Sequence, residues 1–330
     1  MVNPKVACTS FLWLVAGLQG EDGERFHRSF SPEVTRSFTV HDKALWANTP
    51  DLADLSDEAL EEIGPERGWF VFALARQPLS RLWSAWVSKL LMREPTFVNQ
   101  FGTKPWFPRR PEDSQSVNED FKRFVFALRD DPELLGADGH WMPQSDVLNM
   151  GAMNYSHIGR LEDVGTTLAL LEQHLVPQGW SGHLELPHSN RGVLRMAADG
   201  FDRETVAAVE RVYTGDYQAF GYQATMAPGA TPEPAARGGS VPGLNWADAL
   251  NEIIDRHDRY ADLFEIAAAL YHALGSTTSQ LEEARKAVAV MEGRLERAMA
   301  TRSDLEQRLL EQAQIARDFR LALKASGAHS

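Results

Sequence analysis

The chain has 330 residues and a mass of 36.8 kDa, with 43% hydrophobic residues, 24% charged residues and a formal net charge of −13. This length and composition are typical of a soluble protein with about two folding units, which excludes disordered, fibrous and disulfide-rich classes. The acidic balance also argues against nucleic acid or an anionic membrane as the main partner, since both require a broad excess of Lys and Arg.

The compartment is indicated by cysteine usage and by the longest apolar run. Cys8 is the single cysteine and cannot form an intramolecular disulfide, which is typical of a reducing compartment. The apolar run 11–18 is less than half of the roughly 20 residues that a membrane-spanning helix needs. Acidic residues rather than a small-residue cleavage pattern follow it, so a signal peptide is disfavoured. We therefore predict a cytoplasmic protein without a membrane span.

The first polar segment of interest is the loop 4–10, PKVACTS, which precedes a helix predicted to begin near Phe11. A helix N-terminus offers unpaired N–H groups and a partial positive charge, which attract phosphate or sulfate oxygens. The segment lacks the GxxxxGK[ST] pattern, so an ATP-type P-loop is not indicated. The alternative interpretation is a helix capped by Thr9 or Ser10 beside a surface lysine.

The second segment begins with residues 69–75, WFVFALA, which predict a central strand buried on both faces. Arg76 follows this strand, and residues 80–91 have apolar positions at helical spacing. Arg76 at the strand end and Ser84 on the helix can therefore converge on one anion. Alternatively, Arg76 is a structural ion-pair partner.

Later segments continue the alternation of strands and helices. Residues 155–159 predict a short strand, and residues 164–175 and 203–219 each predict a helix. This alternation favours an α/β domain with a mostly parallel sheet, whereas the elements between residues 89 and 150 are left unassigned.

A Pro/Gly/Ala-rich linker over residues 227–244 separates a predicted domain 1–226 from a helical region 245–330. Heptads over about 277–324 favour a coiled coil that forms a homo-oligomer or binds a partner protein. Its seam is weakened by small and polar residues, namely Ala284, Ala298, Arg302 and Gln312. An antiparallel hairpin against residues 246–272, or a solvated charged helix, therefore remains an alternative.

Together these segments resemble the carbohydrate sulfotransferases that depend on 3′-phosphoadenosine 5′-phosphosulfate (PAPS), specifically a bacterial member of the chondroitin/dermatan/HNK-1 sulfotransferase group. PKVACTSF resembles the 5′-phosphosulfate loop of that family, and ALARQPLSRLWSAW resembles its 3′-phosphate motif. Further similarity lies in residues 101–104, 140–141, 155–162 and 213–222. The resemblance implies a P-loop-like, three-layer α/β fold with a central parallel sheet.

By position, the resemblance assigns the 5′-phosphosulfate to the loop residues Lys5, Val6, Ala7, Cys8, Thr9 and Ser10. It assigns the 3′-phosphate to Arg76 and Ser84. Lys5 is placed to neutralise the charge that develops on the leaving phosphate oxygen. No His/Cys ligand spacing is present, so no metal is expected.

The acceptor is an alcohol, so a general base should receive its proton, and histidine is the obvious type. His41 lies between the two phosphate motifs and is favoured, and His140 in the similar Gly-His-Trp segment is the second candidate. The alternative for each is a packed or surface histidine.

Three features depart from the family pattern. Gln77 stands where an acidic residue usually follows the arginine, and the paired cysteines of animal members are absent. Only residues 1–3 precede the phosphosulfate loop, so the family's first strand is either very short or begins upstream of Met1.

We therefore expect a PAPS-dependent sulfotransferase that acts on a carbohydrate or glycoconjugate. A neutral or lightly charged sugar is expected, because Lys104, Arg109 and Arg110 are the only local candidates for a basic channel. The alternative is a catalytically degenerate sulfotransferase-like protein that acts as a coiled-coil scaffold or partner-binding module. A small-molecule kinase is disfavoured by the missing P-loop.

Overall fold

The computed structural model describes residues 2–28, 36–187, 201–223, 251, 254, 255, 258 and 278–326. The chain forms two compact units, the first from residues 1–85, 125–191 and 202–226, and the second from residues 86–124, 192–201 and 227–330. Within the described ranges, no helix is both long and apolar enough to cross a bilayer.

The first unit contains a small parallel sheet. Strand β1 (Phe72–Ala75) pairs with β2 (His157–Arg160) in the register Phe72↔His157 to Ala75↔Arg160. Both predicted strands are confirmed, although β1 is shorter than the apolar run 69–75. The described part of the sheet has these two strands, and the larger three-layer, P-loop-like arrangement remains a prediction.

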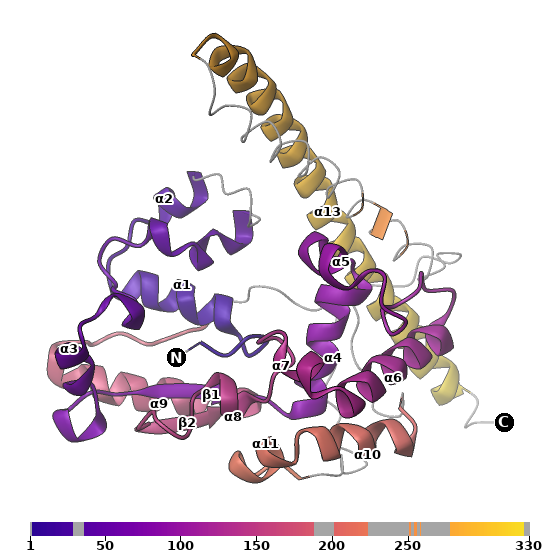
Figure 1. The fold of residues 1–330 in the computed structure, drawn as a ribbon. Helices are drawn as coiled ribbons and strands as arrows, with labels where there is room; N and C mark the ends of the chain where they lie inside the picture. The colour runs from indigo at the N-terminus through magenta and orange to yellow at the C-terminus, as the bar shows by residue number, and fades with distance from the viewer. Residues whose placement is uncertain are drawn as a thin grey trace. The chain divides into compact units, whose positions relative to one another are not determined.

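The two faces of β1 pack against different elements, because successive side chains of a strand point to opposite faces. The cluster on one face consists of Val6, Phe11 and Leu74. Helix α1 (Cys8–Leu18) and helix α9 (Val164–Leu175) contribute further apolar side chains to it (Figure 1). The cluster on the other face consists of Ala73, Ala75, Leu148 and Phe220. The strand is thus buried on both faces, as its sequence predicts.

A glycine allows α9 to approach β2 closely. A Cβ atom at Gly159 would lie 2.0 Å from Thr167 Oγ1 and 2.9 Å from Leu74 Cδ2. Thr167 is fully buried on α9 and lies 3.0 Å from His157 Nε2. The predicted helix 164–175 is confirmed, and Gly159 explains how it fits against the sheet.

The helix predicted after β1 is confirmed, whereas the single helix predicted over residues 203–219 is wrong. Helix α4 (Pro78–Trp86) continues into a π-helical turn, η5 (Val87–Leu91). Residues 203–219 instead form α10 (Arg203–Val212) and α11 (Thr214–Ala219), separated at Tyr213. The buried Tyr213 hydroxyl donates a hydrogen bond to the Trp141 main-chain oxygen at 2.5 Å. That contact favours the break, which also brings Asp216 into the interior.

The segment that the sequence left unassigned is largely helical. Its helices are α5 (Pro95–Phe101), α6 (Ser114–Asp130), α7 (Pro132–Gly136) and α8 (Gln144–Val147). Two short helices, α2 (Gly23–Arg28) and α3 (Asp57–Glu61), lie nearer the N-terminus. His41 is the last residue of a 3-10 segment, η1 (Arg36–His41), which belongs to the first unit.

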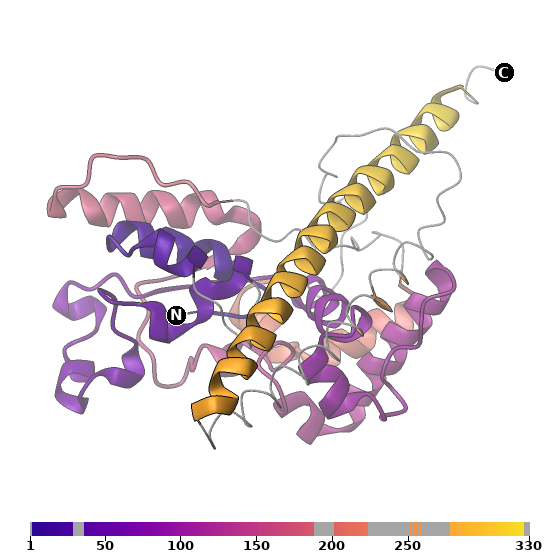
Figure 2. The ribbon, with the colours of Figure 1, turned by 90° about the horizontal axis from the view of Figure 1, so that it is seen from above.

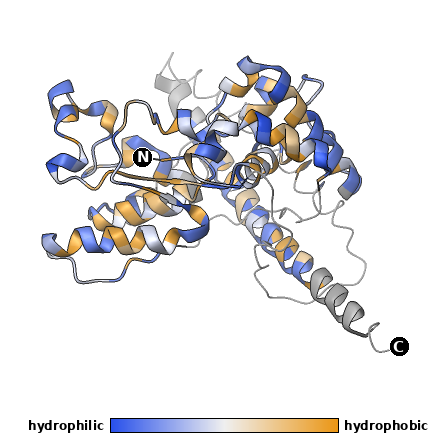
Figure 3. Cartoon of the chain, turned by 90° about the horizontal axis from the view of Figure 1, so that it is seen from below, coloured by the Kyte–Doolittle hydropathy of each residue, from blue (hydrophilic) through white to orange (hydrophobic). Residues whose placement is uncertain are grey.

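The second unit contains a long helix, α13 (Thr278–Ser326), which is continuous in Figure 2. Figure 3 shows hydrophilic and hydrophobic residues interspersed along the coloured, central part of this helix. The predicted helical extension is confirmed, and its pairing as a coiled coil remains a prediction. The predicted linker 227–244 lies outside the described residues, as does most of the alternative hairpin partner 246–272.

Candidate functional site

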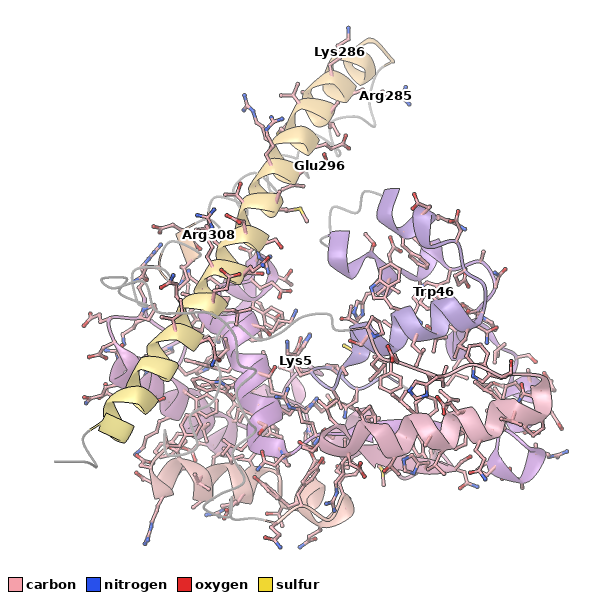
Figure 4. All side chains as sticks on the ribbon, turned by 180° about the vertical axis from the view of Figure 1, so that it is seen from behind. Lys5, Trp46, Arg285, Lys286, Glu296 and Arg308 are labelled. Carbon is pink, nitrogen blue, oxygen red and sulfur yellow. The ribbon has the colours of Figure 1, made fainter. Side chains whose placement is uncertain are left out.

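The loop ahead of α1 has an unusual backbone. Lys5 and Ala7 both adopt positive φ angles, 67° and 52°, which non-glycine residues rarely adopt. Ala7 is the N-cap of α1 and provides no side-chain cap, so the alternative in which Thr9 or Ser10 caps the helix is wrong. Figure 4 shows Lys5 on this loop. The N-cap side chain thus provides no hydrogen bond to the N–H groups of the first helical turn.

Arg81, on α4, connects three separate segments. Its guanidinium donates hydrogen bonds to the main-chain oxygens of Pro4, Met142 and Gly139, at 3.0, 2.9 and 2.7 Å. The side chain is 2% exposed, and burial lowers its pKa. These bonds use one donor on each of the three guanidinium nitrogens, three of its five N–H groups, so Arg81 acts as a structural link.

Arg76 differs from Arg81 in how its guanidinium is used. Its Nη1 donates to the Lys5 main-chain oxygen at 3.1 Å, and this is its one side-chain hydrogen bond within the described residues. A guanidinium carries five N–H donors, so most of the donors of Arg76 are available to a ligand. Burial lowers its pKa, against the opposing influence of Glu162 and Tyr222. A partly desolvated cation with unused donors favours binding of an anion.

The two candidate histidines have different surroundings. His41 Nε2 lies 2.9 Å from Thr9 Oγ1, at the start of α1. His140 Nδ1 lies 2.6 Å from Asp138 Oδ1, which also accepts a hydrogen bond from the His140 main-chain N–H. A carboxylate at Nδ1 holds that proton and leaves Nε2 as the acceptor, which suits a general base.

The other loop and helix residues occupy distinct environments. Val6 is 3% exposed and belongs to the core, so it contributes through its backbone. Thr9 and Ser10 are also buried, and Cys8 is half-buried. Ser84 is half-buried on α4, one turn after Arg81.

A family comparison decides the class of this protein. A model of the sulfotransferase family matches residues 2–223, about two thirds of the chain. The chain belongs to the sulfotransferase family. It is therefore a transferase of sulfonyl groups, and enzymes of this family generally take them from PAPS. Neither the curated proteins nor the solved structures contained a significant match.

In this sulfotransferase, a carboxylate that sequence reasoning did not single out lies beside Gln77. Glu162 follows β2 and accepts hydrogen bonds from the Gln77 main-chain N–H at 3.0 Å and the Tyr222 hydroxyl at 2.7 Å. Burial and the bond to Glu162 raise the pKa of Tyr222. Glu162 and Tyr222 lie in segments 155–162 and 213–222, which resemble the family. That resemblance could have identified both residues from the sequence.

The candidate cations for an anionic acceptor are largely engaged in ion pairs of the second unit. Arg109 Nη2 lies 2.7 Å from Asp120 Oδ1, and Arg110 pairs with Asp255 at 2.6 Å and Asp258 at 3.0 Å. Lys104 is exposed. Among the described residues there is no cluster of three metal-ligating side chains.

Proposed function

We propose that this protein transfers a sulfonyl group from PAPS to a hydroxyl of a carbohydrate or glycoconjugate, as a bacterial, cytoplasmic member of its family. The observation that carries this proposal is the contact between the two anion-binding segments. Arg76, with unused donors, bonds to the main chain of Lys5. A nucleotide with phosphate groups at both ends of its ribose needs two such segments close together.

In the proposed donor site, each of the two anion-binding segments binds one end of the nucleotide. Arg76 and Ser84 bind the 3′-phosphate, and the loop from Lys5 to Ser10 binds the 5′-phosphosulfate. During in-line transfer the acceptor oxygen bonds to sulfur while the bond from sulfur to the phosphate oxygen breaks. Lys5 and the N–H groups at the start of α1 neutralise the charge that develops on this leaving oxygen. No metal is needed for this role.

The acceptor hydroxyl gives its proton to a histidine as the new bond forms. His41 is favoured because it contacts Thr9, at the position of the phosphosulfate loop. His140 is the second candidate, supported by its carboxylate partner and by the bond from Arg81 to the neighbouring Gly139.

The acceptor is proposed to be a neutral or lightly charged sugar. An anionic polymer needs a basic channel, whereas Arg109 and Arg110 are already paired with carboxylates. The C-terminal helix is proposed to pair as a coiled coil with a second copy or a partner protein. The alternative of a degenerate scaffold is not favoured by the family match.

The proposal is tested by calorimetric titration with 3′-phosphoadenosine 5′-phosphate (PAP), the nucleotide product. Wild-type protein should bind PAP, and Lys5→Ala and Arg76→Ala should each bind it more weakly. Arg67→Ala is the matched control, because Arg67 lies in the same unit and makes an exposed ion pair with Glu62. Absence of PAP binding by folded wild-type protein would overturn the proposal.

A further inference from the structure

A fully buried amide lies between the two anion-binding segments. Gln144 is 0% exposed at the start of α8, and its amide makes four hydrogen bonds. Its Oε1 accepts from Asn3 Nδ2 at 3.0 Å and from the Arg76 main-chain N–H at 2.9 Å. Its Nε2 donates to the Arg76 main-chain oxygen at 2.8 Å and to Asp216 Oδ2 at 3.4 Å. Both polar main-chain atoms of Arg76 are therefore held by one side chain.

Each partner of Gln144 is fixed in turn. Asn3 is 3% exposed and also donates to the Leu74 main-chain oxygen on β1, at 3.0 Å. Asp216 is fully buried and accepts hydrogen bonds from the main-chain N–H groups of Gln144 and Ser145, at 2.7 and 2.9 Å. Gln144 thus connects the residues just before the Lys5 loop, the end of β1 and helix α11.

We propose that Gln144 is a positioning residue that fixes the spacing between the Lys5 loop and Arg76, and so matches this spacing to the two anionic groups of one nucleotide. This inference rests on the proposed function. Gln144 lies outside the segments that resemble the family motifs. It acts through the backbone of Arg76 rather than by touching the nucleotide.

The network requires an amide at this position. Two partners donate to Gln144 and two accept from it, and among neutral side chains only an amide offers two acceptor sites and two donors at one terminus. A carboxylate has no donor and would face the carboxylate of Asp216. A buried network with one member unsatisfied is strongly disfavoured, so the substitution should shift the backbone of Arg76.

The test is PAP titration of Gln144→Glu at pH 8 and pH 6, each measured as a ratio to wild type. Burial and Asp216 both raise the pKa of the introduced carboxyl. At pH 8 it is more often ionised, and we expect PAP affinity about tenfold or more below wild type. At pH 6 the protonated carboxyl restores one donor. The ratio of wild-type to variant PAP affinity should therefore be at least about threefold smaller at pH 6 than at pH 8.

The charged and titratable groups around this position are Asp216 and Tyr217 on α11, Tyr213 between α10 and α11, and Arg76 and Arg81 beside β1 and α4. Burial raises the pKa of Tyr213 and of Tyr217, so both remain neutral from pH 6 to pH 8. Their direct contribution to PAP binding is present in both proteins and is removed by the ratio. Their effect on the introduced carboxyl exists only in the variant, where Asp216 raises its pKa and the two arginines lower it.

Asp120→Asn is the matched control for a general loss of stability. Asp120 is 2% exposed and accepts hydrogen bonds from Arg109, but it lies in the second unit. It should lower the unfolding temperature while PAP affinity stays within about twofold of wild type. Should Gln144→Glu not fold, Gln144→Asn, which is one methylene shorter, replaces it and should weaken PAP binding at both pH values.

The outcomes separate the two proposals. If wild type fails to bind PAP, the proposed function is wrong. If wild type binds PAP and folded Gln144→Glu binds it as tightly as wild type does at both pH values, only the positioning role of Gln144 is overturned.

Discussion

Arg76 Nη1 donates a hydrogen bond to the main-chain oxygen of Lys5 at 3.1 Å, although the two residues are 71 positions apart in the chain. Lys5 belongs to the loop that begins α1, and Arg76 follows β1. The contact therefore brings the positive-φ loop that begins α1 next to a guanidinium with unused donors, just after the C-terminal end of β1.

Substitution of Arg76 should mainly affect nucleotide binding, whereas substitution of Arg81 should mainly affect stability. Arg76→Ala should lower PAP affinity by about tenfold or more, because a charge-assisted contact to phosphate is lost. Its unfolding temperature should change little. Arg81→Ala leaves three carbonyl oxygens without their donor and should destabilise the fold by about 3 kcal/mol or more. Calorimetry and thermal unfolding measure the two effects, and equal destabilisation by both variants would contradict this division of roles.

The histidine that acts as base should affect turnover more than nucleotide binding. We expect His41→Ala to lower kcat by about 10²–10⁴-fold, since that is the usual contribution of general base catalysis. PAP affinity should change far less. Steady-state kinetics with PAPS and a sugar acceptor measure this, with His174→Ala on α9 as the control. Full activity of His41→Ala, together with loss in His140→Ala and Asp138→Asn, would assign the base to His140 instead.

Gly159 and Gly165 form a matched pair for testing how α9 packs on the sheet. Gly159→Ala places a Cβ atom 2.0 Å from Thr167 Oγ1 and should destabilise the protein by about 1–3 kcal/mol or prevent folding. Gly165 lies at the start of α9, where an added Cβ would meet no neighbouring atom within 4 Å outside the local helix backbone. Gly165→Ala should therefore be neutral or stabilising by less than about 1 kcal/mol. Denaturant unfolding distinguishes them, and similar midpoints would show that α9 lies farther from β2.

Glu210 should make stability depend on pH. Burial raises the pKa of its carboxyl, and Oε1 is buried without a hydrogen-bond partner in the described structure. An acid whose pKa is raised by folding stabilises the fold when protonated, and this contribution is lost as pH rises through its folded pKa. Glu210→Gln should therefore raise the unfolding temperature by about 1–2 °C at pH 8.

The difference for Glu210→Gln should be smaller at pH 4, where the carboxyl is mostly protonated. Glu61→Gln is the control, because Glu61 is exposed on α3. A change that is independent of pH, or that is equal in the two variants, would show that burial of Glu210 does not govern its ionisation.

Local sequence patterns predicted much of the architecture. The apolar run before Arg76 gave β1, and the apolar spacing in residues 164–175 gave α9, whose observed bounds are the same. The same reasoning failed at Tyr213, where helical spacing continues but a hydrogen bond to Trp141 accompanies a break in the helix. Spacing reports which residues prefer the interior, whereas the hydrogen bond at this break is made with a partner 72 positions away.

Local patterns in the sequence were enough to predict the small parallel sheet, the helices that flank it and the two segments with the residue types to bind anions. The different roles of Arg76 and Arg81, which lie five residues apart in one motif, became visible in the three-dimensional contacts of their side chains. The acceptors of Arg81 lie 58 to 77 positions away, and those carbonyl oxygens engage all three of its guanidinium nitrogens. Gln144 was overlooked for the same reason, because a hydrogen bond between distant residues leaves no periodic pattern in either segment.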